Sequence, residues 1–127
     1  MIKNFLIINC TGLNNKIGLK IKNNFFIYKF NSKVKNNDLL VSTILNFTNK
    51  HKVKIDSDFS IIINIGPGSF SSIRIALSVA KGIAISCGVK LFGFKNDDLP
   101  QFNLANIELL LNKSLIKKNL IKPIYLS

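Results

Sequence analysis

Residues 63–88 read INIGPGSFSSIRIALSVAKGIAISCG and hold the most specific pattern in the chain. The run at residues 59–65 is almost continuously apolar and β-branched, which is typical of a central strand covered on both faces. Apolar residues then recur at helical spacing over residues 72–86. The segment therefore predicts a buried strand that leads directly into a helix.

The loop between this strand and helix is suited to a sharp turn. Gly66 and Gly68 allow the backbone to turn sharply where the strand ends, and Pro67 fixes one φ angle. Ser69 or Ser71 can cap the helix. Because exposed N–H groups at a helix start favour an anion, phosphate binding is one function open to this loop. A plain turn is the other, since the loop lacks the lysine and hydroxyl residue of a P-loop and the three glycines of a dinucleotide motif.

The predicted helix has a wide apolar surface. One stripe holds Ile73, Ala76, Leu77, Ala80, Ile83, Ala84 and Cys87, and a second flank holds Ile75, Val79 and Gly82. Small residues at every fourth position let another helix approach closely. The cover for the second flank must come from the first helix, from the tail or from another protein, and we expect another polypeptide to contribute.

The remaining elements place this unit in an α/β fold with a five-stranded mixed sheet. Turn-forming residues separate three short apolar segments, which predicts an antiparallel meander, and a helix, the central strand, a second helix and a last strand follow. The expected ranges are 5–8, 17–21 and 25–30 for the first strands, 38–50 for the first helix, 89–94 for the last strand and 107–120 for a tail helix.

Composition limits the class of protein. The chain has 127 residues, of which 47% are hydrophobic, enough for one folded domain. Cys10 and Cys87 form no CxxC motif, so we expect a reducing, cytoplasmic location. No apolar run approaches the ~20 residues of a membrane-spanning helix, so we expect no membrane contact.

The formal net charge of +12 makes nucleic-acid binding a function to consider, because a cationic surface attracts phosphate backbones. Lysine supplies nearly all of this charge, and lysine, asparagine and isoleucine are enriched together, as an AT-rich coding sequence would produce. Specific base recognition favours guanidinium groups, and Arg74 is the one arginine. The charge therefore favours at most weak, salt-sensitive tRNA binding.

Residues for catalysis are scarce. The acids include two close pairs, Asp56 with Asp58 and Asp97 with Asp98, at a strand start and in a loop, where acids commonly solvate turns. His51 is the single histidine and is expected to face solvent at a helix end. Cys10 as a nucleophile would need a nearby base, and a small buried residue is the favoured interpretation. The sequence thus predicts no catalytic residues, no metal and no cofactor.

Residues 65–84 resemble the signature of the TsaB (YeaZ) family, in which a strand is followed by G-P-G-S-F-T-G-x-R and a helix containing A-K-G-L-A. The matching positions are Gly66, Pro67, Gly68, Ser69, Phe70, Arg74, Lys81, Gly82 and Ala84. The order of elements over residues 1–95 also resembles the first lobe of that family, which implies an actin-like, ribonuclease-H-like half-domain. Residues 123–126, PIYL, resemble the family's terminal P-x-Y-L segment.

The chain also departs from the family pattern. Asn9 stands where an aspartate usually ends the first strand, and Ser71 and Ser72 replace threonine and glycine. We expect residues 1–95 to form the first lobe and residues 96–127 a short helical tail, with the second lobe deleted.

The resemblance implies a non-catalytic scaffold or activator rather than an enzyme. Such a subunit docks by its helices on a TsaD-type catalytic subunit that modifies the adenosine beside the tRNA anticodon with threonylcarbamoyl. A TsaE-type ATPase is expected to join the complex, and this chain is expected to contact tRNA only indirectly, through the complex. A homodimer can form when the partner is absent. The expected partner interface and signature loop comprise Gly66, Pro67, Gly68, Ser69, Phe70, Ile73, Arg74, Ala76, Leu77, Ala80, Lys81, Gly82 and Ala84. The alternatives are a small nucleotide- or phosphate-binding protein using residues 66–70 and a weak tRNA-binding module.

Overall fold

A computed structural model describes residues 2–113 of the chain as one mixed sheet with three α-helices. The strands lie in the order β3-β2-β1-β4-β5, with β1, β2 and β3 antiparallel and β1, β4 and β5 parallel. The elements are β1 (Asn4–Asn9), β2 (Lys16–Ile21), β3 (Asn24–Lys29), α1 (Asn37–Lys50), β4 (Phe59–Asn64), α2 (Phe70–Cys87), β5 (Lys90–Phe94), the 3₁₀ helix η1 (Asn96–Asp98) and α3 (Leu104–Asn112). The predicted mixed five-stranded sheet is confirmed.

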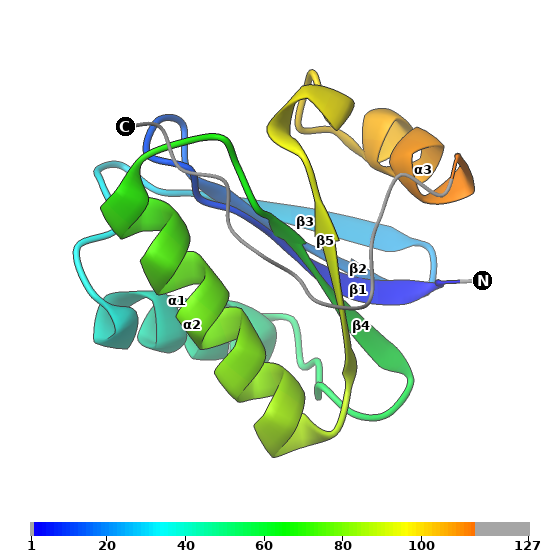
Figure 1. Cartoon of the computed structure of the whole chain (residues 1–127). Coiled ribbons are helices and arrows are strands. Elements are labelled where there is room, and N and C mark those ends of the chain that lie inside the picture. The colour runs from blue at the N-terminus through cyan, green and yellow to red at the C-terminus, as the bar shows by residue number, and fades with distance from the viewer. Residues whose placement is uncertain (1, 114–127) are drawn as a thin grey trace.

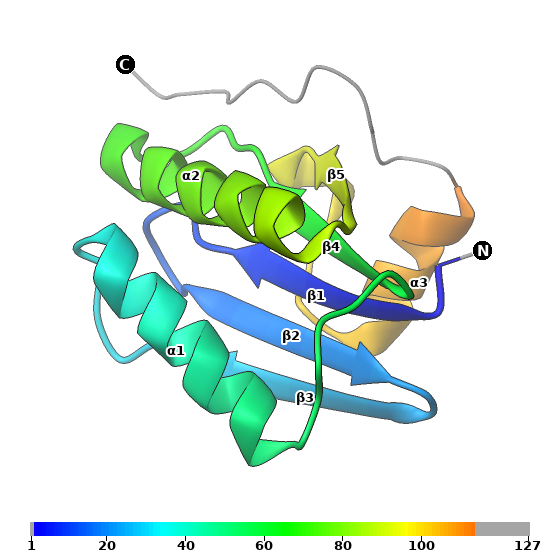
Figure 2. The same cartoon turned by 90° about the horizontal axis from the view of Figure 1, so that it is seen from below.

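The helices form layers on both faces of this sheet. Figure 1 and Figure 2 show α1 and α2 side by side on one face and α3 on the other. All six residues of β4 are buried, as expected for a central strand between two layers. Side chains of β1 alternate between the layers, so Leu6 and Ile8 pack toward α1 and α2 while Phe5 and Ile7 pack toward α3.

The helix boundaries follow local capping groups. The Asn36 side chain caps α1 by accepting the Leu39 N–H at 2.8 Å. Helix α2 begins at Phe70, two residues before the predicted start, and ends at Cys87, where Gly88 caps it in the left-handed conformation. Helix α3 begins three residues earlier than predicted, and the rest of the expected tail helix, with the PIYL segment, lies outside the described residues.

Helix α2 is long and apolar enough, by length and composition alone, to cross a membrane. In the structure it lies on the sheet, and Ile73, Ala76 and Ala80 have no exposed surface. One helix of this kind is weak evidence for a membrane span, because helices that pack on a sheet in globular proteins satisfy the same two criteria.

Candidate functional site

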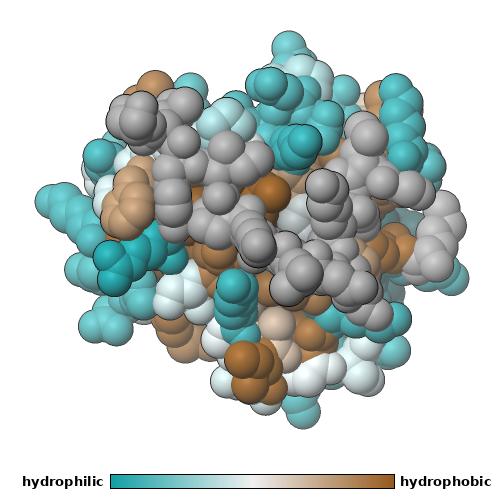
Figure 3. Space-filling model, viewed as in Figure 1, coloured by the Kyte–Doolittle hydropathy of each residue, from teal (hydrophilic) through white to brown (hydrophobic). Residues whose placement is uncertain are grey.

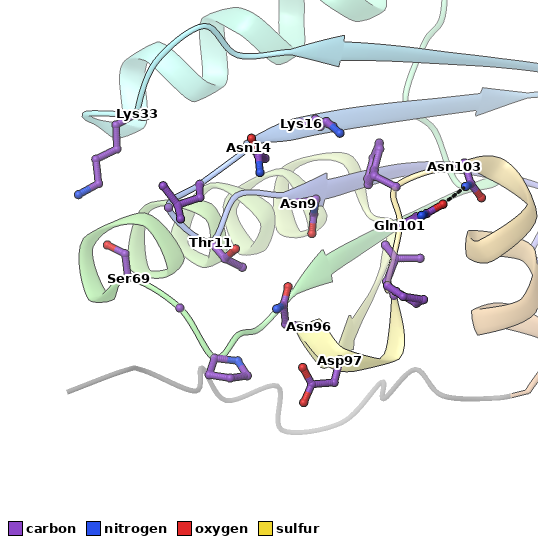
Figure 4. Close-up of a pocket in the computed structure, with 17 residues that line it drawn as sticks. Asn9, Thr11, Asn14, Lys16, Lys33, Ser69, Asn96, Asp97, Gln101 and Asn103 are labelled. Atoms are coloured by element: carbon purple, nitrogen blue, oxygen red, sulfur yellow. Dashed lines mark hydrogen bonds between the residues drawn. The ribbon is translucent and has the colours of Figure 1, made fainter.

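A polar cleft lies at the carboxyl ends of the parallel strands β1 and β4. It encloses about 1070 Å³ between the β1–β2 turn, the loop after β4 and the segment after β5. Figure 4 shows the residues that line this space, with Asn9 at the end of β1, Lys16 at the start of β2, and Asn96 and Gln101 after β5. Ligands of open α/β sheets bind at this edge, so the cleft is a candidate site by position alone.

Asn64 ties the strands together beneath this cleft. Its side chain is 1% exposed. The Nδ2 group donates to Oδ1 of Asn9 at 2.6 Å and to Oδ1 of Asn96 at 2.9 Å, while its own Oδ1 accepts the Gly66 N–H at 2.9 Å. One buried amide thus links β1, β4, the loop after β4 and η1, and it uses both of its donor hydrogens.

The GPGS loop, residues 66–69, is held in place by hydrogen bonds that its backbone N–H groups donate. The Ser69 N–H donates to the Thr11 carbonyl at 2.8 Å, the Gly66 N–H is held by Asn64, and Pro67 has no N–H. Gly68 packs so closely on Thr11 that a Cβ there would lie 2.6 Å from the Thr11 carbonyl oxygen. The N–H groups of Gly66 and Ser69 are therefore occupied, and the loop ties the start of α2 to the β1–β2 turn. Phosphate binding by residues 66–70 stays a prediction.

Ser72 lies at the first turn of α2 with a buried hydroxyl that has no hydrogen-bond partner. An unpaired buried hydroxyl costs about 1–3 kcal/mol, and alanine is the better helix former. We therefore expect Ser72→Ala to raise the free energy of unfolding by about 1–2 kcal/mol, measured by urea denaturation. The exposed Ser71→Ala serves as the control, and a loss of stability in Ser72→Ala alone would contradict the assignment.

The structure divides the predicted interface residues of α2 into two groups. Ile73, Ala76 and Ala80 are fully buried and Leu77 is 7% exposed, because this stripe packs on the sheet. The expectation that these four side chains contact a partner therefore fails in this fold. Phe70, Arg74, Lys81 and Gly82 are exposed, and Ala84 is half-buried.

The small-residue stripe has a different role from the one expected. It lets α2 lie close to the strands, and the first helix, α1, covers part of the second flank, including Val79 at 5% exposed. The cover expected from another polypeptide is thus partly supplied by the chain itself.

An apolar groove of about 570 Å³ remains open between α1 and α2. Val41 and Leu45 line it from α1 and are 36% and 55% exposed, while Gly82 and Ile83 line it from α2. Ile85, on the outer side of α2, is 83% exposed. In Figure 3 apolar atoms also reach the surface in the lower half of the view, where the C-terminal half of α2 lies.

The residues considered for catalysis each have a local structural environment. Burial raises the pKa of the Cys10 thiol to about 12, so this cysteine stays neutral at physiological pH. His51 does not face solvent as predicted: its ring stacks on Phe26, with centroids 3.7 Å apart, and meets Phe47 edge-on. The Asp56 carboxylate accepts the Asp58 N–H, as acids in turns commonly do. Within residues 2–113 no three His, Cys, Asp or Glu side chains are grouped to hold a metal.

Comparison with solved structures identifies the fold. YeaZ from Pseudomonas aeruginosa superimposes with a TM-score of 0.66 and 18% sequence identity, covering 76% of this chain and 45% of that protein. A second Pseudomonas aeruginosa structure, described as an uncharacterized protein with similarity to peptidase YeaZ, gives a TM-score of 0.65 at the same identity and covers 44% of that protein. The chain has a YeaZ-like fold. This likeness agrees with the predicted α/β fold built on a five-stranded mixed sheet.

The YeaZ-like part spans less than half of the length of the YeaZ structures. No protein-family model and no curated protein matches the sequence. The structural likeness therefore concerns the fold, and the activity and partners of a complete YeaZ protein come to this chain only as proposals.

Asn64 is the residue of this site that the sequence analysis missed. The signal that could have found it is a lone asparagine in an otherwise buried strand, because such a side chain requires hydrogen-bond partners. Asn9 stands where the resembled family usually has an aspartate, and its Oδ1 accepts a hydrogen bond from Asn64.

Proposed function

We propose that this chain is a non-catalytic, cytoplasmic subunit of the tRNA threonylcarbamoyladenosine machinery, docking on a TsaD-type catalytic subunit through α1 and α2. The observation that carries the proposal is the apolar groove between these helices on a YeaZ-like fold. The GPGSF signature lies at the N-terminus of α2 and fixes how this helix leaves β4. The proposal thus rests on the resemblance for the partner and on the open groove for the surface.

Leu45 is the most useful residue for testing this surface. Its side chain lines the groove and is 55% exposed, so a charge there leaves the core intact but places a carboxylate in the interface. Hot-spot residues of interfaces often cost 2 kcal/mol or more when altered. We therefore expect Leu45→Glu to abolish co-elution with the TsaD-type subunit encoded in the same genome.

Leu109→Glu provides the matched control. Leu109 is 50% exposed but lies on α3, on the other face of the sheet. We expect this variant to co-elute with the partner as the unaltered chain does. Absence of any complex with the unaltered chain, or equal loss in both variants, would refute the proposal.

The same groove can also support self-association when the partner is absent. A groove that is lined by two helices can pair with its own copy about a two-fold axis. Light scattering of the isolated chain distinguishes a dimer from a monomer, and Leu45→Glu should shift a dimer formed in this way to monomer.

A further inference from the structure

Two lysines face each other on the sheet beside the polar cleft. Lys16 of β2 and Lys29 of β3 are directly opposite in the antiparallel register, and Lys16 is in turn paired with Asn9 of β1. Directly opposed residues project to the same face with Cβ atoms roughly 5 Å apart, and like charges in this arrangement are destabilising. An anion between the two ammonium groups would remove that cost.

This part of the sheet is open to solvent. Ile27 lies two residues before Lys29, on the same face, and is 47% exposed, so α3 does not cover the strand here. Lys16 and Lys33 both line the cleft, and among the described residues that line it Asp97 is the one carboxylate. Residues 1–37 contain seven lysines and no acid.

The cleft itself offers groups that suit a nucleobase. The side-chain amides of Asn14 and Gln101 line it, and amides can pair with the hydrogen-bonding edges of bases. The Asn103 amide also lines it, but its Oδ1 caps α3 by accepting the Asn106 N–H. Leu13 at the rim is 84% exposed, and the Phe102 ring lines the cleft from the segment after η1. Apolar and aromatic side chains of this kind support an unstacked base.

We infer that this cleft binds a single-stranded segment of RNA, with a base in the cleft and successive phosphates along Lys33, Lys16 and Lys29. A strand is favoured over a free nucleotide because the positive charge continues past the cleft onto the edge strand β3, where Lys29 lies. The inference rests on the proposed function only for the choice of RNA over DNA. It places direct RNA contact on the face of the sheet opposite the α1–α2 groove.

Fluorescence anisotropy with a labelled ten-nucleotide single-stranded RNA of mixed sequence tests this site on the full chain. We expect the double variant Lys16→Ala with Lys29→Ala to weaken binding about tenfold and to reduce the slope of log affinity against log salt by about 1.4, since each phosphate contact contributes about 0.7. The control is the double variant Lys54→Ala with Lys81→Ala, which removes the same charge from the α1–α2 side. We expect it to weaken binding no more than about twofold.

The alternatives give distinct results. Equal weakening by the two double variants would overturn the site in favour of diffuse attraction. If ATP or AMP bound as tightly as the RNA, the ligand would be a free nucleotide and not a nucleic-acid strand. If single-stranded DNA of the same sequence bound more tightly, the choice of RNA over DNA would be wrong. Because the Lys16 and Lys29 double variant removes a repulsion, its melting temperature should match or exceed that of the unaltered chain, so misfolding cannot explain its loss of binding. Co-elution with the TsaD-type subunit remains a separate measurement.

Discussion

Gly68→Ala is expected to lower the free energy of unfolding by about 4 kcal/mol, the largest single effect we foresee. A Cβ at this position would lie 2.6 Å from the Thr11 carbonyl oxygen and 2.7 Å from the Thr11 Cβ. Because the nearest obstacle is backbone, the β1–β2 turn or the loop after β4 must move. Overpacking costs up to about 3 kcal/mol, and the same movement breaks the hydrogen bond between the half-buried residues Ser69 and Thr11, at about 1 kcal/mol.

Gly82→Ala is the matched control for this substitution. Gly82 is also a glycine of the signature segment, but it lies within α2, and a Cβ there would meet no atom within 4 Å. Alanine in a helix interior is favoured over glycine by about 0.5–1 kcal/mol, so this variant should be more stable than the unaltered chain. Urea denaturation followed by circular dichroism measures both. A Gly68→Ala variant that loses less than about 1 kcal/mol would show that the close contact with Thr11 is not a constraint.

The order of the elements could be predicted because it depends on local patterns. Alternation in residues 17–21, helical spacing in residues 38–50 and the apolar run before Gly66 each determine one element without reference to the rest of the chain. The boundaries shifted by one to three residues where capping decides them, as at Phe70, where α2 starts at the end of the GPGS loop.

The candidate sites were harder to predict because they depend on register and packing. The spacing of Ala76 and Ala80 does not reveal whether a sheet or a helix will cover them, and here the sheet does. Lys16 and Lys29 become opposed only through the β2–β3 register. Asn9 and Asn64 are 55 positions apart in the chain, and only the parallel pairing of β1 with β4 brings their amides together.

Asn64→Leu is expected to lower the free energy of unfolding by about 3 kcal/mol, because it removes the one buried amide that joins four parts of the fold. The substitution leaves the buried Gly66 N–H without its acceptor, and an unpaired buried donor costs about 1–3 kcal/mol. It also removes the two bonds that Nδ2 makes to Asn9 and Asn96. Leucine adds apolar burial in return, but it cannot replace any of these three bonds.

The burial of each asparagine predicts how much stability its substitution costs. Asn96 is exposed, so after Asn96→Ala water can take its place and the loss should stay below about 1 kcal/mol. Asn46→Leu, an asparagine change on the exposed face of α1, should alter stability by no more than about 0.5 kcal/mol. If Asn64→Leu proved no more harmful than Asn46→Leu in the same denaturation experiment, the carboxyl ends of β1 and β4 would be held by apolar packing alone. The GPGS loop would then not depend on the amide network beneath the cleft.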